Sequence, residues 1–208
     1  MIRRNKSVWS LALAVASAVT LGGCESTVRQ DPIYVRNSTD TLVFPDIAFF
    51  RDRPLDESLR SSLALADYAT ALDRTGLLTL LQRPGPFTVF AIPNQPLEAA
   101  QSADGGHLLD PATLPSLRRE LGYTIVQGAF KEAQLRGMIA KARGPVALRT
   151  IDGDVLTVSV EPATNQMVLS DPQGQTNRIW LSSMPQSNRV LYAMQSMLDP
   201  AAPVRANR

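Results

Sequence analysis

The chain has 208 residues, enough for one domain with appendages, and 44% of them are hydrophobic, which excludes wholesale disorder. Its formal net charge of +2 depends on the first 23 residues, which carry Arg3, Arg4 and Lys6 and no acid, so the remainder holds 18 basic and 19 acidic residues. This remainder has no basic stripe with interleaved aromatic residues, and the sequence therefore excludes nucleic-acid binding as a function class.

Residues 1–23 are predicted to form a secretory signal peptide. The three basic residues precede an apolar run over residues 8–19, which is too short to span a membrane. Arg3 and Arg4 leave twin-arginine export open as an alternative. Leu21-Gly22-Gly23-Cys24 then resembles a bacterial lipobox, the motif at which lipoprotein precursors are cleaved.

Cys24 is the predicted lipidation site. It is the only cysteine, so an intramolecular disulfide is excluded, and the alternative is a small buried thiol near the terminus. The lipobox resemblance implies a diacylglyceryl thioether on Cys24 and an acyl group on its amine, and two or more acyl chains suffice for stable anchoring. It makes the membrane a partner, and Glu25, where inner-membrane lipoproteins commonly have Asp, favours the outer membrane of a Gram-negative bacterium.

Residues 24–54 are expected to comprise the lipidated terminus, a tether and an N-terminal extension. Residues 26–41 are polar and without periodicity, as in a flexible tether, whereas residues 42–50 are apolar enough to pack on the domain as an extra strand. A helix is predicted over residues 58–72 with Gly76 as its C-cap, and a short helical turn over residues 77–81.

Residues 87–92 are predicted to form one strand, ended by Pro93, with Asn94 as the N-cap of the helix behind it. Neighbouring side chains of a strand point to opposite faces, so Val89 and Phe90 face opposite ways. Because the run is apolar throughout, both faces of the strand are expected to be buried.

The remaining elements shift from helices to strands. We expect a loop over 101–110, helices over 116–121 and 132–142, and strands over 123–126, 146–150, 155–160, 167–170, 178–182 and 190–194. Asp152-Gly153 predicts a two-residue hairpin, and Gly144 lies just past the second of these helices. Helices early and strands late indicate the α+β class.

Four segments, in this order, resemble signatures of the fasciclin domain. They are Gly85-Pro86-Phe87-Thr88-Val89-Phe90-Ala91-Ile92-Pro93-Asn94, Leu121-Gly122-Tyr123-Thr124-Ile125-Val126-Gln127-Gly128, Thr150-Ile151-Asp152-Gly153-Asp154-Val155-Leu156-Thr157-Val158 and Asn188-Arg189-Val190-Leu191-Tyr192-Ala193-Met194-Gln195-Ser196-Met197-Leu198-Asp199-Pro200. The resemblance implies a wedge-shaped β-sandwich with helices packed along one edge, formed by residues 55–200 and followed by a tail over 201–208. Three positions depart from the family pattern: Thr124 and Tyr192 replace histidines, and Arg189 replaces a glycine.

The sequence nominates no catalytic residue, metal ligand or cofactor-binding residue. His107 is the only histidine and has no ligands at zinc spacing and no nucleophile motif, so we interpret it as a surface or loop residue. Asp152 and Asp154 are interpreted as turn residues rather than cation ligands. Met194 is expected in the core with Met197, three residues later, rather than in a binding groove, and Trp180 in core or edge packing.

Tyr123 is the one nominated partner contact, because the family resemblance implicates this tyrosine region in receptor adhesion. The alternative is a packed strand residue, and Thr124 beside it departs from the adhesive pattern.

The family resemblance implies a non-enzymatic adhesion or interaction module, lipid-anchored in the cell envelope, with an unidentified protein or envelope partner and no small-molecule substrate. Two alternatives stay open. One is a carrier with an enclosed apolar pocket, and the other is an envelope enzyme with a cleft of converging titratable groups.

Overall fold

The computed structural model describes residues 33–34, 48–49, 54–186, 189–198 and 200. The predicted signal peptide, Cys24, most of the predicted tether and the tail over 201–208 lie outside these residues. Within the predicted extension, β1 (Ile33–Tyr34) pairs antiparallel with β2 (Ala48–Phe49). The extra strand expected over 42–50 thus corresponds to β2, and the rest of that range lies outside the described residues.

The prediction of one helix over 58–72 is wrong, because the chain forms two helices there. They are α1 (Leu55–Ser61) and α2 (Ala66–Arg74), separated by an extended Ser62. α2 ends before Gly76, whose φ of +74° is the left-handed conformation expected of a glycine beyond a helix end. The short helical turn predicted next is α3 (Leu77–Gln82).

Asn94 causes the interruption between α1 and α2. Its side-chain Nδ2 donates to the carbonyl of Leu63 at 2.9 Å, and its Oδ1 accepts from the backbone N–H of Asp67 at 3.2 Å. Asn94 therefore caps α2, twenty-seven residues away in sequence, and not α4 (Asn94–Ala103), to which it belongs and whose N-cap position is held by Pro93. The predicted capping role is correct in kind and wrong in its helix.

Seven strands form one mixed sheet in the order β4-β3-β9-β8-β7-β6-β5, in which only β3 and β9 run parallel. The strands are β3 (Phe87–Ala91), β4 (Ile125–Gln127), β5 (Val146–Arg149), β6 (Val155–Val160), β7 (Met167–Ser170), β8 (Thr176–Gln186) and β9 (Arg189–Met194). The two edge strands meet where Val126 bridges Thr150 and the N–H of Ile151 donates to the carbonyl of Ile125 at 2.9 Å. The sheet is therefore nearly closed, like a barrel.

Two further sequence predictions are corrected in this region. Tyr123 is the last residue of α5 (Leu114–Tyr123), so the strand predicted from 123 begins only at Ile125. The hairpin between β5 and β6 is not a two-residue turn. Thr150 pairs with Asp154 through an N–H···O bond of 2.9 Å, which leaves a three-residue loop with Gly153 at φ +89°.

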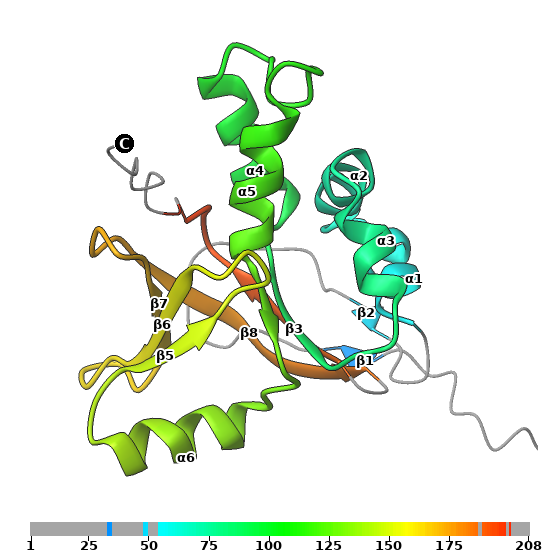
Figure 1. Ribbon diagram of the computed structural model, residues 1–208. Coiled ribbons are helices and arrows are strands. Elements are labelled where there is room, and N and C mark those ends of the chain that lie inside the picture. The colour runs from blue at the N-terminus through cyan, green and yellow to red at the C-terminus, as the bar shows by residue number, and fades with distance from the viewer. Residues whose placement is uncertain (1–32, 35–47, 50–53, 187–188, 199, 201–208) are drawn as a thin grey trace, which may run out of the picture.

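The helices divide into two groups around the barrel. Figure 1 shows α1–α5 at the upper and right sides, and α6 (Glu132–Ala142) below the barrel, apart from the rest. The loop predicted over 101–110 begins later, because α4 continues to Ala103, and α6 ends at a left-handed Arg143, one residue before Gly144. The predicted α+β class is confirmed.

The core lies between the sheet and the α1–α5 group. β3 runs through its centre, where Val89 and Phe90 are both fully buried, which confirms that both faces of this strand are covered. The ring of Phe90 stacks on Tyr192 of β9 with a centroid distance of 5.1 Å. Met194 and Trp180 are buried as expected.

Candidate functional site

The three positions that depart from the fasciclin pattern all hold the fold together. The Thr124 hydroxyl donates to the carbonyl of Leu121 at 2.7 Å and accepts from the buried Tyr68 hydroxyl at 2.6 Å, and burial raises the pKa of Tyr68. The hydroxyl of Tyr192 donates to the carbonyl of Phe130 at 2.8 Å. The two hydroxyls that stand where the family pattern has histidines are therefore both used in hydrogen bonds inside the domain.

Arg189 has a comparable structural role at the other end of β9. Its guanidinium donates to the carbonyl of Arg83 at 2.8 Å, which connects β9 to the residue after α3. A glycine, the usual residue here in the family pattern, would supply no such bond. The departure therefore adds a contact between sheet and helices.

Tyr123 is fully buried at the end of α5, and its hydroxyl donates to the carbonyl of Val155 in β6 at 2.7 Å. Burial, reinforced by the charges of Asp171 and Asp154, raises the pKa of Tyr123, so the phenol stays protonated and keeps this bond. The packed alternative is confirmed, although on a helix and not on a strand. Partner contact at Tyr123 stays a prediction. In the structure, the Tyr123 side chain joins α5 to the β5–β6 hairpin.

His107 lies in the loop between α4 and α5, with its Nδ1 2.7 Å from Oδ2 of Asp110 and both side chains largely exposed. In the part of the chain that the structure describes, no three His, Cys, Asp or Glu side chains gather as a metal site would require. Asp154 of the β5–β6 hairpin lies 3.6 Å from the guanidinium of Arg119 in α5, and burial is the main cause that raises the pKa of neighbouring Asp152.

The candidate interaction site is a groove of about 550 Å³ between α4, α5 and the segment after β9, which we call the α4–α5 groove. Small and apolar side chains form much of its lining, and two acids, two hydroxyls and an amide supply its polar part. The lining residues are Ala100, Ala103, Asp104, Leu108, Thr113, Ser116, Leu117, Glu120, Gln175, Met197 and Leu198.

Sequence reasoning misses this groove, because it places Met197 in the core, whereas Met197 is only partly buried and lines the groove. Residues from four separate stretches line it, and they meet only in the fold, where α4, the loop after it, α5 and the segment after β9 face one hollow. The Thr113 hydroxyl donates to the carbonyl of His107 at 2.5 Å and lies 2.9 Å from the carbonyl of Asp110. It thus connects the start of α5 to the loop that lines the groove.

A second hollow, of about 460 Å³, lies over β6, β7 and β8, and its polar groups are engaged within the fold. Glu161 pairs with Arg178 at 3.2 Å, and the pKa of Glu161 is lowered first by the Thr164 hydroxyl and then by Arg178. The Asn177 amide oxygen accepts from the backbone N–H of Gln195 at 3.0 Å.

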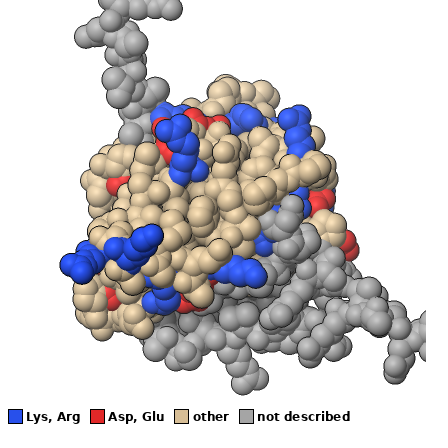
Figure 2. All heavy atoms as spheres, turned by 60° about the horizontal axis from the view of Figure 1, so that its bottom comes forward, with Lys and Arg blue, Asp and Glu red and all other residues tan. Residues whose placement is uncertain are grey.

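Charge separates the two ends of the domain. Residues 84–117, which include α4 and much of the groove, contain three acids and no Lys or Arg, whereas residues 129–151 around α6 contain five basic residues and one acid. Figure 2, which brings the α6 side forward, shows Lys and Arg side chains projecting around a broad uncharged area. Among the described residues, none of the helices has the length and apolar character needed to cross a membrane.

Comparison with known proteins gives a family and a fold. A family model described as Fasciclin domain matches residues 64–200. Mouse (Mus musculus) Stabilin-1 is 30% identical over 153 residues, which cover 71% of this chain but only 5% of Stabilin-1. The solved FAS1 domain pair of the insect cell adhesion molecule Fasciclin I superposes with a TM-score of 0.60 at 13% identity, over 70% of this chain and 50% of the other. The fasciclin-like architecture predicted from the sequence is confirmed.

Proposed function

This chain belongs to the fasciclin domain family, and from that premise we propose that it is a lipid-anchored, non-enzymatic interaction module of the bacterial cell envelope. Fasciclin domains are adhesion-type modules, which supports an interaction role. The lipobox-like segment ending at Cys24 supports anchoring, and Glu25 after it supports the outer membrane as the location. The partner is a protein or another envelope component held at the α4–α5 groove.

One observation carries this assignment: the signature segments build much of the core, and the groove is left at the surface with only Met197 and Leu198 of the last segment in its lining. Phe90, Thr124 and Tyr192 spend their side chains on internal contacts. The groove instead presents Asp104 and Ala103, both exposed, beside the buried Leu117. An apolar floor with acidic groups at its margin suits a segment that carries small apolar and basic side chains.

The groove is also relevant to the alternative that the protein is a carrier of a hydrophobic ligand. Its volume of about 550 Å³ is in the range of small-molecule pockets. Its lining includes the exposed Asp104 and Ser116, however, and a hydrophobic ligand would remove both polar groups from water. A macromolecular partner that brings its own donors satisfies them better.

The anchor is tested with Cys24→Ser. Wild-type protein is expected to incorporate a palmitate analogue and to stay with the membrane in high salt, while Cys24→Ser is unlabelled and is released or held as an uncleaved precursor. A wild-type protein that is unlabelled and leaves the membrane in salt alone would overturn the anchored module.

The groove is tested by covalent crosslinking in intact envelopes. Ala103→Trp fills the groove from an exposed position, and Ser102→Trp, on an exposed neighbouring position outside the lining, is the matched control. The same crosslinked species should form with wild type and Ser102→Trp and be lost with Ala103→Trp at unchanged thermal stability. Equal crosslinking by both variants would remove the groove from the interface, and tight binding of a fluorescent fatty acid, blocked by Ala103→Trp, would favour the carrier.

A further inference from the structure

We propose that the basic end of the domain, formed by α6 and its flanking residues, rests on the anionic phospholipid surface of the membrane that holds the anchor. The inference depends on the lipid anchor of the proposed function and adds an orientation to it. It makes α6 the membrane-facing side of the domain and the α4–α5 groove the side presented to partners.

Four exposed cations define this basic end: Lys131, Lys141, Arg143 and Arg149. Within the described residues none of the four forms an ion pair, in contrast to Arg136, whose Nε donates to Glu132 at 2.8 Å. Arg136 also donates to the backbone carbonyl of Asn165 at 3.1 Å. Four charges are thus available for an outside anion, and the fifth stabilises the domain.

Their spacing favours a charged plane over one compact anion. Lys131 occupies the N-cap of α6 and Lys141 its last turn, ten residues later, so their backbones lie about 15 Å apart at 1.5 Å per residue. No single phosphate spans that distance, whereas a bilayer presents many mobile phosphates to both ends of a helix. Each Lys or Arg near such a surface is attracted to it with a similar free energy, so the four cations contribute in a similar way.

The surface between the cations is low and uncharged. Ala133, Gly137 and Ala140 are exposed on α6, and no side chain longer than a methyl group stands on these positions. Figure 2 shows this side as a broad uncharged area with basic side chains around it. Small residues let the helix backbone approach the headgroups while Lys141 and Arg143 extend to the phosphates.

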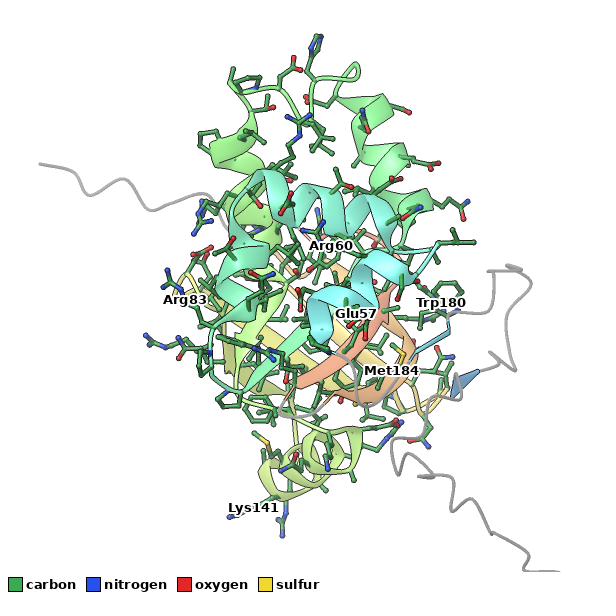
Figure 3. The ribbon with its side chains drawn as sticks, turned by 90° about the vertical axis from the view of Figure 1, so that its right-hand side faces the viewer. Glu57, Arg60, Arg83, Lys141, Trp180 and Met184 are labelled. Atoms are coloured by element: carbon green, nitrogen blue, oxygen red, sulfur yellow. The ribbon has the colours of Figure 1, made fainter. Side chains whose placement is uncertain are left out.

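The tether brings this side toward the membrane. Eight residues lie between Cys24 and Ile33 at the start of β1, so β1 lies within about 30 Å of the lipid anchor even with the chain fully extended. β1 lies in the lower half of the domain in Figures 1 and 3, as do α6 and Lys141, while α4 is at the top. The acidic end, with Glu98, Asp104 and Asp110, is repelled by the same surface.

The test uses the chain from residue 24 onward with Cys24→Ser, which keeps every residue that the structure describes. It is mixed with vesicles of phosphatidylcholine alone or with 30 mol% phosphatidylglycerol, and binding is measured by co-sedimentation at low and high salt. Lys141→Glu/Arg143→Glu is compared with Arg74→Glu/Arg83→Glu, an equal charge change at exposed positions on the α1–α3 side. Figure 3 shows Arg83 on that side and Lys141 below it.

We expect binding only to the anionic vesicles, lost at high salt, and weakened about tenfold or more by Lys141→Glu/Arg143→Glu but not by the control. Circular dichroism melts verify that both variants are folded, and Lys141→Ala/Arg143→Ala supplies a milder change if the charge reversal unfolds the domain. Equal losses in both variants, equal binding to neutral vesicles, or binding to dextran sulfate but not to phosphatidylglycerol would overturn the proposal. Because the Cys24→Ser protein carries no acyl anchor, vesicle binding can fail while palmitate labelling of the wild type succeeds, and labelling can fail while vesicle binding succeeds.

Discussion

The two ends of this domain are built alike and charged oppositely. At the upper end, α4 packs on α2, α5 packs on α2, α3 and β4, and both helices line a groove that includes Asp104 and Glu120. At the lower end, α6 packs on β5 and β6 through the buried Leu135 and leaves Lys131 and Lys141 exposed. Helices at both ends bury apolar side chains in the core, so packing does not distinguish the ends.

What distinguishes the ends is the residues that packing leaves free. The fasciclin signatures lie in the barrel and at the helix ends that touch it, and their side chains are consumed by the core. The surface positions of α4 and α6 are outside these signatures and can differ between members of one fold without cost to stability. The comparison teaches that the family resemblance predicts the fold, whereas the surface charge at each end determines which partner that end can bind.

The largest expected effect removes the frame that both ends share. Phe90→Ala deletes a fully buried ring that stacks on Tyr192, and it should destabilise the domain by about 3–5 kcal/mol. Phe87→Ala, at a partly exposed position of the same strand, should cost clearly less, and Val89→Ala removes less volume. Urea melts of the three variants check this order. A Phe90→Ala protein as stable as its parent would show that β3 is not the common support.

The second effect is confined to the upper end. Asn94→Ala removes the amide that accepts from the N–H of Asp67 and donates to the carbonyl of Leu63, so α2 loses its cap, and we expect a loss of about 1–2 kcal/mol. Gln95→Ala, at the next and exposed position of α4, is the matched control and should stay within about 0.5 kcal/mol. Hydrogen exchange should report the opening in α1 and α2 while α6 keeps its protection. Equal loosening of α6 would mean that the two ends are not independent.

Asn94 also marks where sequence reasoning stops. Its type predicts capping, and its position before a helix points to that helix, but the orphan N–H that it satisfies belongs to a helix twenty-seven residues earlier. Local sequence patterns predict the strands, the helix end at Gly76 and the burial of both faces of β3. They do not predict the break at Ser62, beside the contacts of Asn94, or the loop at Gly153, beside the bond from Ile151 to Ile125, because these contacts join distant segments.

The candidate site lies still further from local prediction. Tyr123 could be nominated because the family resemblance points to it, and the structure shows its hydroxyl used by Val155. The groove could not be nominated, because Ala103, Leu117 and Met197 are ordinary apolar residues until α4, α5 and the end of β9 meet. The excess of cations around α6 is present in the sequence, but only the fold shows which of them form ion pairs.

A smaller effect tests the boundary between the two ends, at the β5–β6 hairpin. The pKa of Asp152 is raised chiefly by burial, so the folded state holds the proton more tightly than the unfolded chain does. The resulting stability is present at pH below the ordinary Asp pKa and is lost as pH rises through the raised value. Asp152→Asn lacks this loss, so its stability relative to the parent should improve between pH 3 and pH 6.

The size of this change is limited by solvent. Asp152 as a whole residue is exposed, so its carboxyl group is only partly desolvated and the gain should stay under about 1 kcal/mol. Melts of parent and variant across the pH range provide the measurement, with Asp110→Asn, on the exposed loop, as a control. A stability difference between Asp152→Asn and the parent that does not vary with pH would contradict the raised pKa of Asp152.

The smallest expected effect concerns the only histidine, at the tip of the upper end. His107 pairs with Asp110 at 2.7 Å, but with side chains 69% and 53% exposed, and such pairs contribute little. The loop is held instead by Thr113, which donates to the backbone carbonyl of His107 and would do so with any residue there. His107→Ala should therefore change the free energy of unfolding by less than about 0.5 kcal/mol.

His107→Ala should also leave crosslinking at the α4–α5 groove unchanged, because the neighbouring Leu108 lines the groove and His107 does not. Urea melts and the envelope crosslinking assay measure both quantities on the same protein. A folded His107→Ala protein that has lost a biological activity would favour the enzyme alternative and would make the acidic end a reactive site rather than a docking surface.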